Sequence, residues 1–224
     1  MKKLFILSIL AVLVSSCAEQ VTRGVRYAKL YEEKPLTMVV MPPINKTSNV
    51  AAKEYFYTTL YAPLSEKGYY VFSPYMTMDI FQGESAYDSE MFIDGDLSMF
   101  KNVLNADAAM FTVVKSWKKS FIGGKVTVGI EYILKSTSTN EVLYKREGLI
   151  TIDTSVKSNV GGLAGMLISA ASTALRTAMT EHVQAGRTCN VYVLSDLPVG
   201  KYNENYGLDK ELLSGNPYIK ATVE

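Results

Sequence analysis

The sequence has 224 residues, of which 48% are apolar and 20% are charged, with 15 Gly and 7 Pro. This composition is typical of a single globular domain and excludes collagen-like, low-complexity and largely disordered chains. Lys and Arg number 23 against 22 Asp and Glu, without the basic excess that nucleic-acid binding needs, and the single histidine excludes a His-rich metal site.

The amino terminus has the three parts of a secretory leader. Two lysines precede an apolar run from Leu4 to Val14, and small residues follow it. The run covers about 11 residues, fewer than the roughly 20 that cross a bilayer as a helix. We therefore expect residues 1–16 to be a signal peptide that is removed, which leaves 21 basic and 22 acidic residues.

The leader ends in a pattern that resembles the bacterial lipobox. Val14 is followed by Ser15, Ser16 and Cys17, which is an aliphatic residue, two small residues and a cysteine. This spacing predicts that Cys17 receives diacylglycerol and a further acyl chain such as palmitate, since two or three chains anchor stably. The alternative is an ordinary leader with a chance cysteine near its end.

The residue after the cysteine indicates to which membrane the lipoprotein is sent. Ala18 stands where an aspartate would retain a lipoprotein at the inner membrane of many diderm bacteria. We therefore expect a membrane anchor in the outer membrane, facing the periplasm, without a spanning helix. Residues 17–35 are expected to be the lipidated cysteine and a tether that ends at Pro35.

The domain proper is predicted over residues 36–186, and it begins as a β-α-β unit. Leu36 to Met41 is an apolar run typical of a buried strand, which Pro42 and Pro43 end. A loop to Asn49 precedes a helix over about residues 50–67, kinked at Pro63, and a short strand follows over residues 69–72.

The middle of the domain changes from helical to alternating periodicity. A helix through residues 97–105 is predicted, with Asp94 or Asp96 as its cap. Strands are then predicted over residues 109–121, 125–134 and 141–152 because apolar and polar residues alternate, and Gly123 and Gly124 mark the first turn. These strands predict an antiparallel meander.

The carboxyl-terminal part returns to helical composition. A helix is predicted over about residues 159–183, and a loop-rich extension over residues 187–224, with an edge strand at residues 191–194. The predicted fold class is therefore α/β, or α+β: a mixed sheet of about five strands with helices packed on it.

Several segments resemble a family of bacterial lipoproteins of unknown function that is related in fold to the TolB amino-terminal domain. The matching segments are Val39-Val40-Met41-Pro42-Pro43-Ile44-Asn45, residues 63–72, Asn105-Ala106-Asp107-Ala108, residues 138–144, Leu197-Pro198 and Tyr206-Gly207. The resemblance implies a mixed sheet in periplasmic lipoproteins that assemble with others. Relatives of this fold include a curli-secretion channel lipoprotein, a ring-forming exopolysaccharide-export lipoprotein and activators of peptidoglycan synthases, and some relatives are auxiliary to ABC transport.

Few residue patterns indicate chemistry. His182 is next to Glu181 on a predicted helix, where a structural role is favoured over catalysis. The segment Asp94-Gly95-Asp96 lacks the spacing of a calcium loop, and the glycines at residues 161–165 lack the Lys-Ser or Lys-Thr pair of a phosphate loop. Cys189, with no partner once Cys17 is a thioether, is expected to be a buried thiol. We expect no metal and no cofactor.

Two candidate sites remain. Tyr55, Tyr57 and Tyr61 are predicted to extend outward from the first helix as a contact stripe, because tyrosine is favoured at binding surfaces. The loop containing Pro42, Pro43 and Asn45 follows a central strand, where open α/β sheets often bind ligands.

These features favour a non-enzymatic, lipid-anchored lipoprotein that acts as an assembly or accessory component of an envelope machine for export or wall synthesis. Its partners would be the membrane, through the lipid, and copies of itself or another envelope protein. The alternatives are a small-ligand-binding accessory of a transporter and, ranked lower, a periplasmic hydrolase that uses carboxylates.

Overall fold

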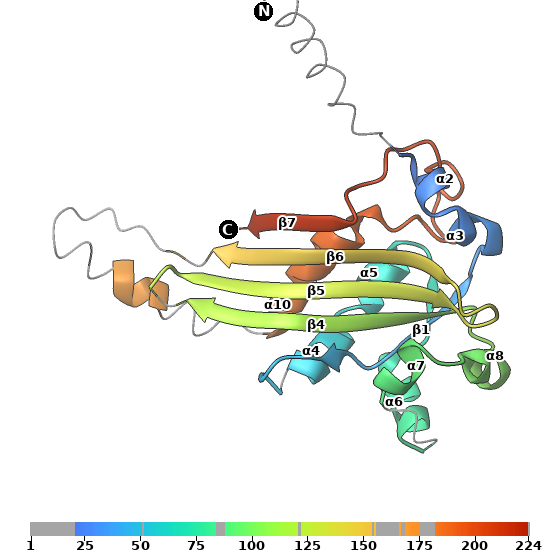
Figure 1. The fold of residues 1–224 in the computed structure, drawn as a ribbon, viewed down its shortest axis with the longest axis horizontal. Helices are drawn as coiled ribbons and strands as arrows, with labels where there is room; N and C mark the ends of the chain where they lie inside the picture. Colours follow the sequence, from blue (N-terminus) through green and yellow to red (C-terminus); the bar gives the residue numbers. More distant parts are fainter. Residues whose placement is uncertain are drawn as a thin grey trace, which may run out of the picture.

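The structure is a computed structural model that describes residues 21–50, 52–83, 88–120, 122–153, 155, 166, 169–174 and 182–223. Within these residues, one mixed sheet of seven strands has the order β3-β1-β4-β5-β6-β7, and β2 also pairs with β4. Figure 1 shows the three long strands at the centre of the molecule. The α/β class, the β-α start and the meander are confirmed, with more strands than the five expected.

The sheet begins with short parallel strands and two helices. These elements are β1 (Thr37–Val40), β2 (Ile44–Asn45), α4 (Ala52–Thr58), α5 (Tyr61–Glu66) and β3 (Tyr70–Val71). β1 pairs in parallel with both β3 and β4. The expected single helix over residues 50–67 is two helices, and the break precedes Tyr61, where the Thr59 hydroxyl donates to the Phe56 carbonyl at 2.8 Å.

The predicted meander is present and is longer than expected. Antiparallel β4 (Ala108–Ser120), β5 (Lys125–Ser136) and β6 (Val142–Asp153) make up most of the sheet. A bulge between Val114 and Ser116 shifts the register of β4 against β5. The alternating apolar side chains of β5, which include Val126, Val128 and Ile130, are fully buried on one face.

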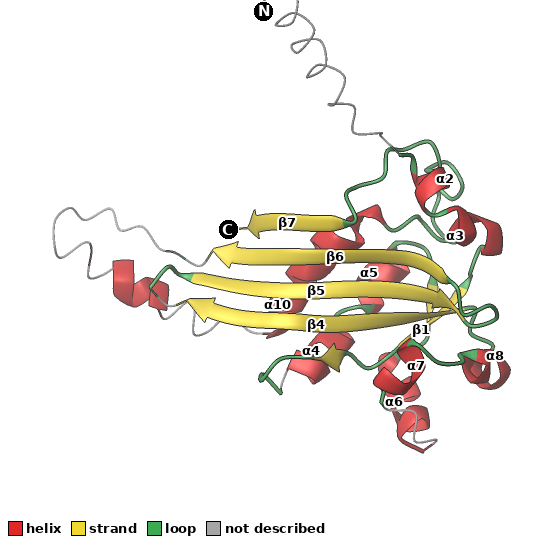
Figure 2. Cartoon of the chain, viewed as in Figure 1, coloured by secondary structure: helices red, strands yellow, loops and turns green. Residues whose placement is uncertain are grey.

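Helices cover the two faces of the sheet unequally. On the first face, α4, α5 and α10 (His182–Val193) lie behind the long strands in Figure 2 and enclose the larger apolar cluster. On the second face, α6 (Pro74–Gly83), α7 (Glu90–Ile93) and α8 (Ser98–Leu104) pack a smaller cluster only at the β1 end. The remaining strands of the second face therefore carry charged side chains. The predicted capping of α8 by Asp94 or Asp96 is wrong, because the N-cap residue is Leu97 and Asp94 ends α7. Asp96 instead accepts the amide of Ser98, the first residue of α8, at 2.9 Å.

The carboxyl-terminal part differs from the prediction. α10 continues through Gly186 to Val193 and is followed by η1 (Leu194–Asp196), so residues 191–194 are not a strand. A Cβ at Gly186 would lie 2.9 Å from the Thr59 hydroxyl, which shows that this glycine permits close packing and does not end the helix. The edge strand is β7 (Tyr218–Val223), which pairs in parallel with β6.

Two further predictions concern residues that lie partly or wholly outside the part of the chain that the structure describes. The helix predicted over residues 159–183 lies mostly outside the described residues, of which Met166 and residues 169–174 are helical. The signal peptide and Cys17 lie outside them too. In the part of the chain that the structure describes, no helix is long and apolar enough to cross a membrane.

The segment expected to be a tether is folded from residue 21 onward. α2 (Arg23–Arg26) and α3 (Ala28–Glu33) lie beside the carboxyl-terminal loops (Figure 1), and Tyr27 and Leu30 are buried in the larger cluster. The spacing of Tyr27, Leu30 and Tyr31 is that of one helix face. The boundary of the folded part therefore comes before Pro35.

Candidate interaction surface

An exposed aromatic surface lies at the β3 edge of the sheet. It surrounds a cavity of about 560 Å³ that α5, β3, α6 and the loop after Gly200 line together. We call its exposed apolar side chains the aromatic edge: Tyr61, Tyr70, Met76, Ile80 and Tyr202. Each comes from a different turn or element, so the surface exists only in the folded chain.

Hydrogen bonds around Gly68 bring Tyr202 to this edge. The Tyr202 amide donates to the Gly68 carbonyl at 3.0 Å, and the Gly200 amide donates to the Lys67 carbonyl at 2.8 Å. Gly68 has a φ of +90°, and a Cβ there would lie 2.4 Å from the Asn203 nitrogen. Only glycine combines that conformation with so close an approach of two backbones.

The predicted tyrosine stripe is divided by the structure. Tyr61 lies on the aromatic edge, whereas Tyr57 is buried and its hydroxyl contacts the Pro74 carbonyl at 3.1 Å and the Thr77 hydroxyl at 3.0 Å. Tyr57 therefore joins α4 to α6 and is not part of a contact surface, because the chain turns between Thr58 and Tyr61. Tyr55 belongs to α4, and its side chain lies outside the described residues.

The polar groups of the predicted ligand loop already form hydrogen bonds with other groups of the protein. Pro42 and Pro43 are buried, and the Pro42 carbonyl accepts the Ser89 hydroxyl at 2.6 Å. The Asn45 side chain accepts from the Thr47 amide at 3.0 Å and donates to the Asn49 carbonyl at 2.7 Å. These three residues shape a turn next to β2, and neighbouring Ile44 and Lys46 line a separate cavity.

That second cavity, of about 450 Å³, lies on the charged face of the sheet. Lys115 contacts Glu131 at 3.1 Å and Glu147 at 2.7 Å, and Lys145 contacts Glu131 at 3.0 Å. Burial alone would raise the pKa of Glu131, but the hydrogen bonds from Lys145 and Lys115 lower it below its usual value. The carboxylate is therefore held ionised, as an ion-paired group rather than a proton donor.

The other residues that the sequence analysis considered for catalysis or ligand binding are either structural or outside the described residues. Cys189 is fully buried as predicted, and burial raises the pKa of its thiol to about 12. The His182 side chain and the glycines at residues 161–165 lie outside the described residues. Within the described residues, no group of three or more His, Cys, Asp or Glu could hold a metal ion.

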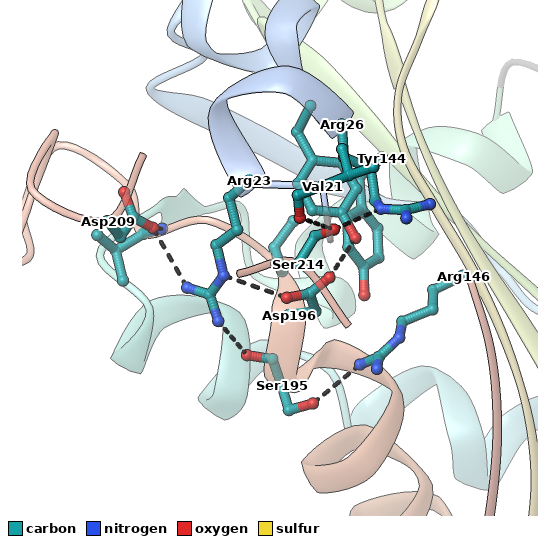
Figure 3. A network of polar contacts seen from close by, with 12 residues as sticks. Val21, Arg23, Arg26, Tyr144, Arg146, Ser195, Asp196, Asp209 and Ser214 are labelled. Carbon is teal, nitrogen blue, oxygen red and sulfur yellow. Dashed lines mark hydrogen bonds and ion pairs between the residues drawn. The ribbon is translucent and has the colours of Figure 1, made fainter. Parts of the chain in front are cut away.

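A polar network that the sequence analysis did not find joins the two ends of the chain (Figure 3). Arg23 contacts Asp196 at 3.1 Å and Asp209 at 3.5 Å, and both carboxylates are buried. The Tyr27 hydroxyl donates to Asp196 at 2.5 Å, and burial together with this bond raises the pKa of Tyr27. No spacing in the sequence links groups so far apart; only the helical spacing of Tyr27 and Leu30 could have suggested that this segment packs.

Arg146 and Lys67 extend this network toward the core. Arg146 is buried and donates to the Ser195 hydroxyl at 2.9 Å and the Asn216 carbonyl at 2.9 Å. Lys67 donates to the Leu197 carbonyl at 2.9 Å. Burial, with nearby Arg23 as a further cause, lowers the pKa of Lys67 to about 8.

Comparisons with known proteins identify relatives of the chain. A family model described as "Putative lipoprotein GNA1162-like" matches residues 25–198. A curated protein of Neisseria meningitidis serogroup B, "Putative lipoprotein NMB1124/NMB1162", is 25% identical over 197 residues, which cover 86% of this chain and 91% of the relative.

Three solved structures are similar to part of the chain. Lipoprotein GNA1162 from Neisseria meningitidis has a TM-score of 0.49 and 23% identity, covering 63% of this chain and 98% of that one. A PelC dodecamer from Paraburkholderia phytofirmans has a TM-score of 0.33 and 15% identity, covering 67% and 86%. The LpoB carboxyl-terminal domain from Escherichia coli has a TM-score of 0.38 and 12% identity, covering 56% and 94%.

Proposed function

The chain belongs to the putative lipoprotein GNA1162-like family, and on that premise we propose that it is a lipid-anchored, non-enzymatic component of the cell envelope. It assembles with copies of itself or with proteins of an export or wall-synthesis machine. In this proposal residues 1–16 are a signal peptide and Cys17 carries the acyl chains. Ala18 directs the protein to the periplasmic side of the outer membrane.

Anchoring gives such a domain a physical advantage. A lipid that confines the domain to one leaflet raises its effective concentration toward any partner in the same membrane. Two or three acyl chains hold it there stably, whereas one chain would bind reversibly. A weak contact surface on the domain is then sufficient for assembly.

The aromatic edge is the observation that carries the contact part of the proposal. Tyr61, Tyr70 and Tyr202 reach one surface from three separate elements, and all three are exposed. Tyrosine is enriched at the centres of protein interfaces, since it offers a large apolar area and a hydroxyl at low conformational cost. Met76 and Ile80 add apolar area beside them.

Photo-crosslinking in intact cells tests this surface. A photoreactive phenylalanine derivative replaces Tyr61 or Tyr202, and in a matched control it replaces Tyr218, which is as exposed as Tyr61 but lies on β7 at the opposite edge of the sheet. We expect adducts from positions 61 and 202 that are absent or much weaker from position 218. A product of twice the chain mass would identify a homo-oligomer; adducts equally strong from all three positions, or from none, would contradict the proposal.

Anchoring has its own test. Metabolic labelling with a fatty acid should mark the protein, and Cys17→Ser should abolish the label and release the protein from membranes. Undiminished labelling of that variant would refute lipidation at this residue.

A second candidate function is favoured by the cavity on the charged face. It is lined by three lysines and three carboxylates next to the Pro42–Asn45 loop, a setting suited to a small zwitterionic ligand delivered to a transporter. A thermal-shift screen with amino acids, dicarboxylates and inorganic phosphate tests this. A ligand that raises the melting temperature of the wild type but not of Lys135→Met would support it.

A further inference from the structure

The first described residues are fixed to the surface of the domain by backbone hydrogen bonds. The Val21 carbonyl accepts the Ser214 amide at 2.8 Å, the Arg23 amide donates to the Leu212 carbonyl at 2.8 Å, and the Gly24 amide donates to the Lys210 carbonyl at 2.8 Å. Cys17 precedes Val21 by four positions. Fully extended, that stretch spans at most about 14 Å between Cα atoms.

Four aliphatic side chains are exposed on the two segments that these bonds join. Val25 is 71% exposed, Leu208 is 74% exposed, and Leu212 and Leu213 are each 54% exposed. We call them the anchor-side patch. Single exposed apolar residues are ordinary, but several on adjoining segments indicate a surface that contacts something apolar.

The loop that carries the leucines is held in a way that keeps them outside. Asp209 is only 4% exposed, although it directly follows the 74% exposed Leu208. Its carboxylate accepts the Val199 amide at 3.0 Å and pairs with Arg23 at 3.5 Å. The usual burial of a leucine and exposure of an aspartate are therefore reversed at this point.

We propose that the anchor-side patch contacts the bilayer that holds the Cys17 lipid, so that the domain is seated on the membrane by a second, apolar contact. This rests on the proposed lipidation of Cys17. The headgroup region of one leaflet is about 5 to 8 Å thick, so a reach of about 14 Å leaves little room between the surface around Val21 and the lipid. A bilayer is thus the apolar partner that the covalent anchor itself brings to this patch.

The charges around the patch indicate how the contact forms. Exposed Arg26 and Lys210 lie beside exposed Glu211, which leaves a small net positive charge. Contact therefore depends mainly on apolar insertion at the interface and only weakly on anionic lipid. We expect it to persist in high salt.

Fluorescence of the lipidated, mature protein in vesicles tests the contact. Single cysteines are introduced as Leu212→Cys, Val25→Cys and, as a matched control, Ile122→Cys. Ile122 is fully exposed in the turn between β4 and β5, and Figure 1 shows this turn at the end of the long strands away from α2. Each is labelled with a polarity-sensitive dye, while buried Cys189 is protected in the native state. The protein is reconstituted in phosphatidylethanolamine and phosphatidylglycerol with lipids that carry quenchers.

At positions 212 and 25 we expect a blue shift and quenching several-fold stronger than at position 122. Adding Leu208→Ser and Leu212→Ser should return the dye at position 25 to the level of position 122, with the melting temperature unchanged. A dye at position 212 that stays in water while the protein floats with vesicles would overturn the inference. So would a blue shift that disappears at low protein density, because a second copy would then cover the patch.

The mass of the amino-terminal peptide separates this test from that of the proposed function. If Cys17 carries acyl chains and the dye at position 212 is in water, the proposed contact of the anchor-side patch with the bilayer is wrong and the lipoprotein proposal stands. If Cys17 carries none, the proposed function fails and the inference falls with it.

Discussion

Arg23 and Asp196 are separated by 173 positions in the chain and lie 3.1 Å apart in the folded protein. The Asp196 carboxylate is buried and the Arg23 side chain is 16% exposed, and Arg23 also pairs with a second buried carboxylate, Asp209. These ion pairs therefore join α2 to η1 and to the carboxyl-terminal loop that contains Asp209.

Removing the arginine should destabilise the protein. Arg23→Ala leaves Asp196 and Asp209 buried without their shared cation, and we expect a loss of about 3 kcal/mol in the free energy of unfolding by urea. The matched control is Lys29→Ala, which breaks the exposed pair of Lys29 with Glu141 and should cost less than about 1 kcal/mol. Equal losses for the two variants would show that the network in Figure 3 contributes no more to the free energy of unfolding than an exposed ion pair does.

Tyr57 and Tyr61 should respond differently to the loss of a hydroxyl. Tyr57→Phe removes the contacts with the Pro74 carbonyl and the Thr77 hydroxyl, and we expect a loss of about 1 kcal/mol in unfolding free energy. Tyr61→Phe should leave stability unchanged within about 0.5 kcal/mol, since the side chain is exposed. Denaturant titration of both variants measures the difference, and a larger loss for Tyr61→Phe would contradict the assignment of surface and core.

Gly68 should be intolerant of any side chain. Gly68→Ala places a Cβ only 2.4 Å from the Asn203 nitrogen and imposes a left-handed backbone on alanine, so we expect a loss of about 2 kcal/mol or more in the free energy of unfolding. Gly83→Ala, where a Cβ meets no atom within 4 Å, is the control and should be neutral. Thermal melts give the comparison, and crosslinking from position 202 should weaken in Gly68→Ala as the loop after Gly200 moves from the aromatic edge.

Lys67 gives the protein a measurable pH dependence. Its pKa is lowered to about 8 in the folded state from 10.5, so the unfolded chain binds more protons between these values and stability rises with pH across that window. Between pH 7 and 9.5 this amounts to about 2 kcal/mol.

The control for this effect is Lys67→Met. The wild type should gain about 2 kcal/mol relative to that variant as the pH rises from 7 to 9.5, because other titrating groups are common to both. Urea titrations of the two proteins at each pH give the difference. A constant difference across the range would mean that Lys67 keeps its ordinary pKa in the folded protein.

The strands of the meander were predictable because each carries a local signal. The alternation from Val126 to Leu134 specifies one buried face, and the fold confirms it. The first helix was predictable in place but not in its break at Thr59, because a threonine hydroxyl makes the same bond to a carbonyl one turn earlier inside unbroken helices. The predicted end of a helix near residue 183 was wrong, since α10 continues through Gly186, whose close packing against Thr59 depends on a residue 127 positions away.

The site was less predictable than the fold, for a related reason. Tyr61 was identified from its residue type alone, but Tyr202 joins it through backbone bonds to Gly68 that no periodicity indicates. The buried carboxylates Asp196 and Asp209 lie in segments rich in Gly and Pro, which resemble solvent-exposed loops when the sequence is taken alone. Long-range ion pairing leaves no mark in local sequence patterns.

The bonds between Val21 and Ser214 also set the order in which the protein can mature. A ribosome makes residue 21 long before residue 214, so α2 has no docking partner until almost the whole chain has been synthesised. A nascent or truncated chain that ends just before Lys210 therefore lacks the backbone groups that hold α2, although it contains every strand from β1 to β6. Docking of α2 is therefore a late step, which only a chain that includes residues 210–214 can complete.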